Sequence, residues 1–272
     1  MTPRAAIFHL IAITLCTHLA CGEDKSVQKV KVATGRISWS VTRTAVIAPK
    51  RPEFIRAING MVDRLPPFPG HPPSPSLNVN GIFDEIEGEG AIIIEAILKG
   101  SRAGVPIEGA VVVHGRITDR KSAVDLMNKG VEELESTFRS LFRVYGGTAT
   151  IWKRSLDSAE PDEQILAARL LARDRVTSAV QSIGKLLGDP REQVAEAAAT
   201  ALGDMGDESA VPVLIRSMNP RALRSEVRAI EAMARIGGVE ASAYLEMTAE
   251  GHENREVREL SIGALTRMRK KR

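Results

Sequence analysis

Aromatic residues and cysteines are scarce in this 272-residue chain, and each shortage disfavours a class of function. Phe, Trp and Tyr make up 4% of the residues, which disfavours the aromatic platforms on which nucleic-acid bases stack. The charges nearly balance, with 37 Lys and Arg against 34 Asp and Glu, so no nucleic-acid partner is expected. The only cysteines, Cys16 and Cys21, are too few for a disulfide framework or a cysteine-rich zinc site.

Familiar catalytic motifs are absent as well. The chain has no Gly-x-Ser-x-Gly elbow, phosphate-binding loop or His-Glu-x-x-His sequence. Beyond residue 20 three histidines remain, and no two have the spacing of metal ligands; they are His71, His114 and His252. We therefore expect no enzyme activity, no cofactor and no metal, although residues distant in sequence could still assemble a catalytic site.

One acidic run could offer oxygen ligands to calcium. It comprises Asp84, Glu85, Glu87 and Glu89. Ile86 interrupts the run and no calcium-loop template fits, so an exposed acidic hairpin is the favoured interpretation.

Residues 1–20 differ from the rest of the chain. Arg4 gives a positive start, residues 5–20 are mostly apolar, and small Ala20 precedes Cys21. This layout is typical of a secretory signal, and the apolar run is too short to favour a membrane span. The sequence His18-Leu19-Ala20-Cys21 resembles a bacterial lipobox, Leu-Ala/Ser-Gly/Ala-Cys. Ala20 and Cys21 agree with the pattern, Leu19 is acceptable at its position, and His18 departs from it.

The lipobox resemblance implies cleavage before Cys21 and lipidation of its sulfur, with residues 21–28 as a polar tether. Cleavage would discard Cys16, and the remaining thiol could form no internal disulfide. Acyl chains contribute about 0.8 kcal/mol per buried methylene, so the anchor would hold the protein at a membrane. The expected location is the bacterial cell envelope, on the outer membrane facing the periplasm; an ordinary signal peptide is the alternative.

Residues 29–150 show strand and helix patterns. Apolar residues alternate from Val30 to Ile47 with the period of a strand, and residues 52–65 have helical spacing. Six prolines fall within residues 65–76, which predicts a stiff surface loop rather than a ligand for a proline-reading domain.

Three further runs, separated by glycine-bearing loops, predict an antiparallel meander; they are 77–86, 91–99 and 105–118. A long amphipathic helix should begin with Ser122 as N-cap and end at Gly146-Gly147. The prediction for 29–150 is an α+β domain, an antiparallel sheet with two helices on one face.

Residues 161–272 contain a repeat. Glutamate-led helix starts place apolar anchors that are 29, 33 and 30 residues apart: Ile165, Val194, Val227 and Val257. Such a step is typical of stacked helical hairpins. The second copy resembles the HEAT-like repeats found in phycobilisome lyases, through Ala198, Ala201, Leu202, Gly203, Gly206 and Asp207. The resemblance implies an all-α solenoid that binds protein; no bilin-handling site is recognisable.

The chain ends with five cations in the six residues 267–272. A solvated helix cap is the favoured interpretation, and contact with anionic lipid or an acidic partner is the alternative. The leading hypothesis is a lipid-anchored envelope protein whose repeats form a scaffold or adaptor for an envelope protein partner.

Two other hypotheses concern the first domain. An envelope enzyme, or enzyme subunit, would carry its site there, in a deep polar pocket between sheet and helices. Alternatively, the domain would be a self-associating assembly module.

Overall fold

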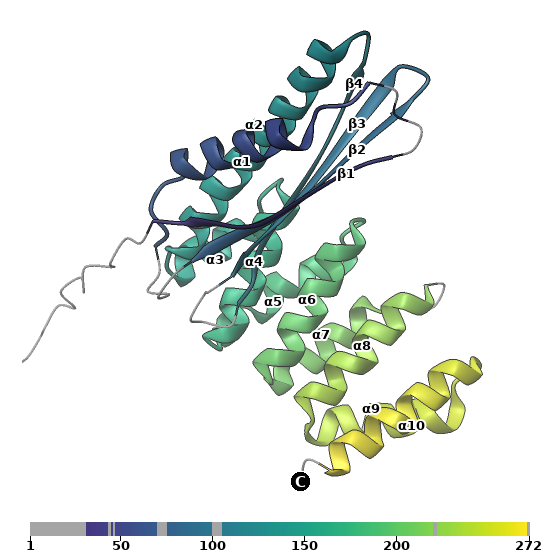
Figure 1. Cartoon of the computed structure of the whole chain (residues 1–272). Coiled ribbons are helices and arrows are strands. Elements are labelled where there is room, and N and C mark those ends of the chain that lie inside the picture. The colour runs from purple at the N-terminus through teal and green to yellow at the C-terminus, as the bar shows by residue number, and fades with distance from the viewer. Residues whose placement is uncertain are drawn as a thin grey trace, which may run out of the picture.

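The computed structural model describes residues 31–42, 45, 47–69, 75–99, 105–219 and 222–270. A four-stranded sheet comes first and a series of helices follows (Figure 1). The strands lie in the order β1-β2-β3-β4. They are β1 (Ala33–Val41), β2 (Ser76–Ile86), β3 (Glu89–Lys99) and β4 (Ile107–Arg116).

The sheet is mixed, so the prediction of an antiparallel sheet is wrong for its first strand. The meander of β2, β3 and β4 is confirmed, but β1 pairs with β2 in parallel, with Ile37 opposite Val79. The connection between the two strands explains this pairing. It passes through helix α1 (Arg51–Arg64), which packs over the sheet, so the chain enters β2 in the same direction as it ran through β1.

The β2–β3 hairpin turns at Glu87 and Gly88. Both residues have positive φ, 53° and 80°, as a tight two-residue hairpin turn requires. The predicted turn is therefore confirmed, and β3 begins at Glu89, two residues earlier than expected.

Helices α1 and α2 (Arg120–Tyr145) cover one face of the sheet, as predicted (Figure 1). The N-cap of α2 is Asp119, whose carboxylate accepts the backbone N–H of Ser122 at 2.8 Å, so Ser122 is not the cap. Ser122 instead accepts the N–H of Asp119 at 3.1 Å, which completes a capping box. Gly146 ends the helix as expected.

The core between sheet and helices is apolar and aromatic. Trp39 stacks on Phe54 with ring centroids 4.4 Å apart. Phe68 is fully buried against Phe142 and Tyr145. The prediction that 65–76 forms only a surface loop is therefore wrong for Phe68; residues 70–74 lie outside the described residues.

The rest of the chain consists of helical hairpins, as expected for helical repeats. The first helices of successive hairpins pack side by side; they are α4 (Pro161–Arg173), α6 (Glu192–Met205), α8 (Leu223–Ile236) and α10 (Arg255–Lys270). The second helices are α5 (Val180–Lys185), α7 (Val211–Ser217) and α9 (Gly238–Gly251). Figure 1 shows these hairpins stacked away from the sheet toward the C-terminus.

Two of the four predicted anchors are only partly buried. Val194 and Val257 are buried, but Ile165 and Val227 are partly exposed. Gln164 and Glu226, each one residue earlier, are the buried side chains at those places. An alignment that uses apolar residues alone misses such positions, because polar side chains can also be buried when they have hydrogen-bond partners.

Candidate functional site: the cleft between the sheet and the repeats

Polar contacts join each repeat to the next. The guanidinium of Arg191 donates to Gln164 Oε1 at 2.7 Å, and Gln164 Nε2 donates to the carbonyl of Leu156 at 3.0 Å. Arg228 on α8 forms an ion pair with Glu192 on α6. These contacts satisfy polar groups at the starts of the first helices and fix the order of the stack.

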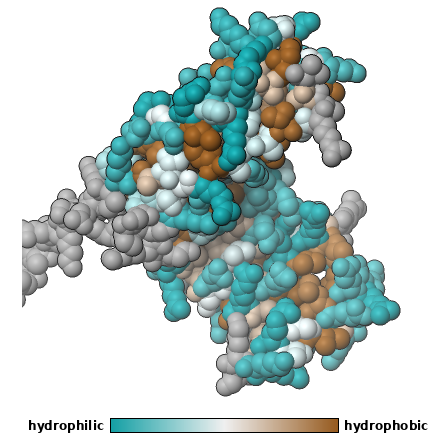
Figure 2. Space-filling model, in the orientation of Figure 1, coloured by the Kyte–Doolittle hydropathy of each residue, from teal (hydrophilic) through white to brown (hydrophobic). Residues whose placement is uncertain are grey.

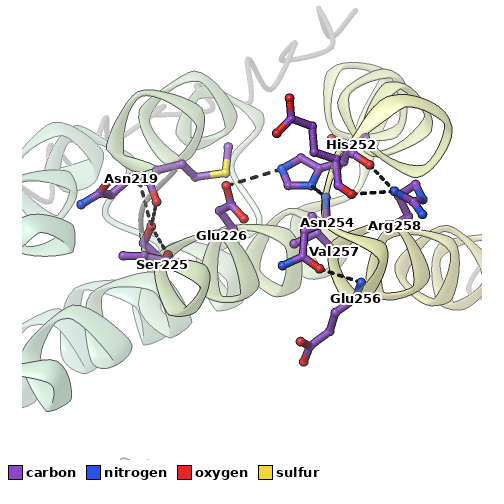
Figure 3. A network of polar contacts seen from close by, with 12 residues as sticks. Asn219, Ser225, Glu226, His252, Asn254, Glu256, Val257 and Arg258 are labelled. Carbon is purple, nitrogen blue, oxygen red and sulfur yellow. Dashed lines mark hydrogen bonds and ion pairs between the residues drawn. The ribbon is translucent and has the colours of Figure 1, made fainter.

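Figure 3 shows the corresponding contact between the last two repeats. His252 precedes α10, and its Nε2 lies 3.5 Å from Glu226 Oε1 on α8. Its Nδ1 accepts the backbone N–H of Asn254 at 3.1 Å, while Arg258 donates to the carbonyl of His252. His252 therefore connects two repeats, a structural role that its place in a predicted loop did not reveal.

The sheet and the repeats share a continuous core through Trp152. This side chain lies on α3 (Ala149–Ser155) and is buried. Its Nε1 donates to the carbonyl of Val144 at 2.8 Å, and the guanidinium of Arg173 lies 5.4 Å from its ring centroid. Trp152 thus connects the end of α2 to the first repeat.

Among the described residues, no helix covers the second face of the sheet. Polar residues alternate there with an apolar row in which Ile82, Ile93 and Val112 are in register across three strands. Val112 is 55% exposed, and Ile97, farther along β3 on the same face, is 43% exposed. Figure 2 shows such apolar patches among largely hydrophilic surface on both halves of the molecule. Exposed apolar patches of this kind commonly mark interaction sites.

Helix α4 lies against the edge of this face. Asp162 Oδ2 accepts the backbone N–H of Ala110 on β4 at 3.4 Å, and Arg169 forms an ion pair with Glu108 at 3.2 Å. The open sheet face and the first helices therefore meet along β4. A cavity of about 550 Å³ lies between them, lined by Glu95, Ile97, Glu108, Asp162, Arg169 and Glu196 among others. We call this concave surface the sheet–repeat cleft.

Two further cavities adjoin the cleft. One of about 620 Å³ lies between α2 and the start of α4 and shares Ala110, Asp162 and Gln193 with the first cavity. The other, of about 470 Å³, shares Arg169 and Thr200 with it. The concave surface thus extends well beyond one small-molecule pocket.

Asp162 has a pKa above the usual range of an aspartate. Burial is the main cause, and the nearby carboxylates of Glu160 and Glu108 act in the same direction. The hydrogen bond from Ala110 and the charge of Arg169 partly oppose the rise. At neutral pH the ionised carboxylate therefore costs some of the stability of the folded chain.

Replacing Asp162 by Asn should stabilise the protein at pH 7, by up to about 0.5 kcal/mol. The pKa of Asp162 is higher in the folded than in the unfolded chain, so protonation of this carboxyl favours folding. That contribution to the stability of the wild type is fully present below the ordinary pKa of Asp and is lost as the pH rises through the folded pKa. The gain should therefore vanish near pH 3.5, which melting curves of both proteins at the two pH values would measure. A loss of stability at pH 7 would show that the ionised carboxylate is favoured instead.

The other residues considered from the sequence do not gather in the cleft. Cys21 and His71 lie outside the described residues. His114 is exposed on the open sheet face. Asp84 and Glu85 point to opposite faces of β2, where Glu85 is buried and accepts the N–H of Ile47 at 2.9 Å. The acidic run therefore does not converge on one ion.

Within the described ranges, no three His, Cys, Asp or Glu side chains are placed to hold a metal ion. None of the helices there combines the length and apolar character needed to cross a membrane. No local pattern pointed to the cleft residues Glu95 and Glu196, which come from separate halves of the chain. The consecutive β-branched runs Ile92–Ile94 and Val111–Val113 place apolar side chains on both faces of the sheet, and this pattern could have indicated that the second face is also apolar.

Comparison with known proteins supports the interpretation of the helical half. No curated protein matches the chain. Residues 150–228, which include α4, α6 and α7, match the family model for HEAT repeats, and this match supports the identification of the chain as a HEAT-like repeat protein.

Proposed function

We propose that this protein is a binding scaffold whose HEAT-like repeats form a short solenoid that docks another protein. The observation that carries the proposal is the sheet–repeat cleft, where an uncovered sheet face and the first helices of the repeats line one concave surface. Repeats of this kind offer extended surfaces of that shape for protein binding.

The arrangement of the core favours the scaffold over an enzyme in the first domain. The enzyme hypothesis predicts a polar pocket between the sheet and its helices. That space holds fully buried apolar side chains, including Phe54, Ile58 and Phe83. The cavity of the cleft lies on the opposite face of the sheet, and the cavity of about 620 Å³ lies outside this core, between α2 and the start of α4.

Partner capture should depend on Ile97, which lines the cleft, and on Val112, which lies farther along the same open sheet face. In the variant Ile97→Lys/Val112→Lys, long charged side chains would replace apolar surface, and both positions are exposed, so the fold should be retained. We expect the full mature chain to enrich a partner from an envelope extract, and the variant to lose most of that enrichment in quantitative mass spectrometry.

The matched control is Val239→Lys/Met247→Lys on α9, where both residues are also exposed. The control should capture the partner as the wild type does. Equal capture by the cleft variant and the wild type would contradict the docking site. The full chain is used because α3 and α4 share a core with α2.

We further propose that the protein is exported and held at the outer membrane, facing the periplasm, by a lipid on Cys21. The support is the signal-like composition of residues 1–20 and the lipobox-like context of Cys21. Replacing Cys21 by Ser should move the protein from the membrane fraction to the soluble periplasmic fraction, which fractionation and immunoblotting would measure. Unchanged membrane association of Cys21→Ser would refute the anchor.

A further inference from the structure

Carboxylates outnumber cations in the central cavity of the sheet–repeat cleft. Glu95 and Glu108 line its central cavity from the sheet, and Asp162 and Glu196 line it from the repeats. Arg169 is the one Lys or Arg among the residues that line this cavity, and its guanidinium lies 3.2 Å from Glu108. The chain as a whole has a formal charge of +3, so the negative charge is concentrated locally.

Two of these carboxylates have no ion pair within the described part of the chain. Glu95 lies in the middle of β3, and Glu196 lies on α6 beyond its first residues. Both are exposed, and neither is an ion-pair partner of a described Lys, Arg or His. Asp162 differs, because its carboxylate accepts the backbone N–H of Ala110 and so joins α4 to β4. Glu95 and Glu196 have no such structural role.

Apolar side chains lie beside the two carboxylates. Along the open face of β3, Glu95 stands between Ile93 and Ile97, and Ile165 lines the same cavity from α4. A ligand that fits this wall must therefore offer apolar surface and positive charge at close spacing. The charge disfavours a nucleic-acid ligand, whose phosphates the carboxylates would repel.

We infer that the sheet–repeat cleft binds a segment of a partner protein in which Lys or Arg side chains alternate with apolar ones. Glu95 and Glu196 receive the cations from opposite walls, and Ile93, Ile97 and Ile165 contact the apolar side chains. The inference rests on the proposed protein-binding function and adds to it the site and the chemical class of the partner. Burial is the main cause of the raised pKa of Asp162, and the carboxylates of Glu160 and Glu108 add to it; a docked cation would relieve this second, smaller contribution.

The test selects peptides from a random dodecapeptide library displayed on phage, with the full mature chain as the target. The peptides recovered should be rich in Lys or Arg next to apolar residues. Their affinity, measured by fluorescence anisotropy, should fall at least tenfold for Glu95→Gln/Glu196→Gln and should weaken with added salt. Circular dichroism and an unchanged melting temperature would confirm that the variant is folded.

The matched control is Glu240→Gln/Glu250→Gln on α9, which removes the same charge from exposed positions outside the cleft. Peptides that bind the wild type and Glu95→Gln/Glu196→Gln equally would overturn the cleft assignment and leave the scaffold function standing. A library that yields no peptide would count against both. A dimer of this chain that Glu95→Gln/Glu196→Gln abolishes would assign the cleft to a second copy and overturn the proposal.

Discussion

Replacing Trp152 by Ala is expected to lower the free energy of unfolding by about 3–5 kcal/mol, the usual cost of deleting a buried aromatic side chain. The ring is 6% exposed and lies between the end of α2 and the first repeat. Its loss would leave a cavity at the junction, remove the hydrogen bond to Val144 and uncover one side of Arg173. Urea unfolding of the protein would measure the change.

Trp152→Phe is the matched control for this prediction. It keeps an aromatic ring in the cavity but removes the indole N–H that binds the carbonyl of Val144. We expect it to cost about 1–3 kcal/mol, because a buried carbonyl loses its partner and some volume is lost. A cost for Trp152→Ala no larger than that of a surface substitution would contradict the shared core.

Replacing Gly203 by Leu should cost about 1–3 kcal/mol, because it overpacks the contact between two repeats. A Cβ at this position would lie 3.2 Å from the backbone Cα of Ala232 and 3.1 Å from Cδ of Arg235. The arginine side chain can move, but the backbone of α8 can yield only if the helices separate. Thermal unfolding would give the cost, and hydrogen exchange should show lower protection in α6 and α8.

Gly188→Leu is the control for overpacking. A Cβ at Gly188 would have nothing within 4 Å, and this exposed residue ends a short 3₁₀ turn (Leu186–Gly188). Its stability should change by less than about 0.5 kcal/mol. Equal costs for Gly188→Leu and Gly203→Leu would show that helix spacing is not the limiting feature.

Local patterns predicted the elements of the first domain well. Alternating and β-branched runs located β2, β3 and β4, and helical spacing located α1 and α2. They could not give the parallel pairing of β1, because strand direction depends on the path of the connection through α1. Phe68 was also missed, since the prolines around it resemble a loop while its ring packs against Phe142, far along the chain.

The repeats were recognised by their step, but their inner register was less accurate. Gln164 and Glu226 occupy buried positions that a search for apolar residues passes over. Each is buried because it has a polar partner from the loop before a later helix: Arg191 for Gln164 and His252 for Glu226. The cleft was beyond sequence reasoning for the same reason, since Glu95 and Glu196 line one cavity only after the two halves pack.

The most direct test of the scaffold is a photo-crosslinking amino acid placed at position 112 of the full chain in living cells. Val112 lies in the apolar row of the open sheet face, and Val239, which is 78% exposed on α9, provides the comparison site. We expect a covalent adduct with a partner protein from position 112 and none from position 239. Adducts from position 239 alone would contradict docking on the open sheet face.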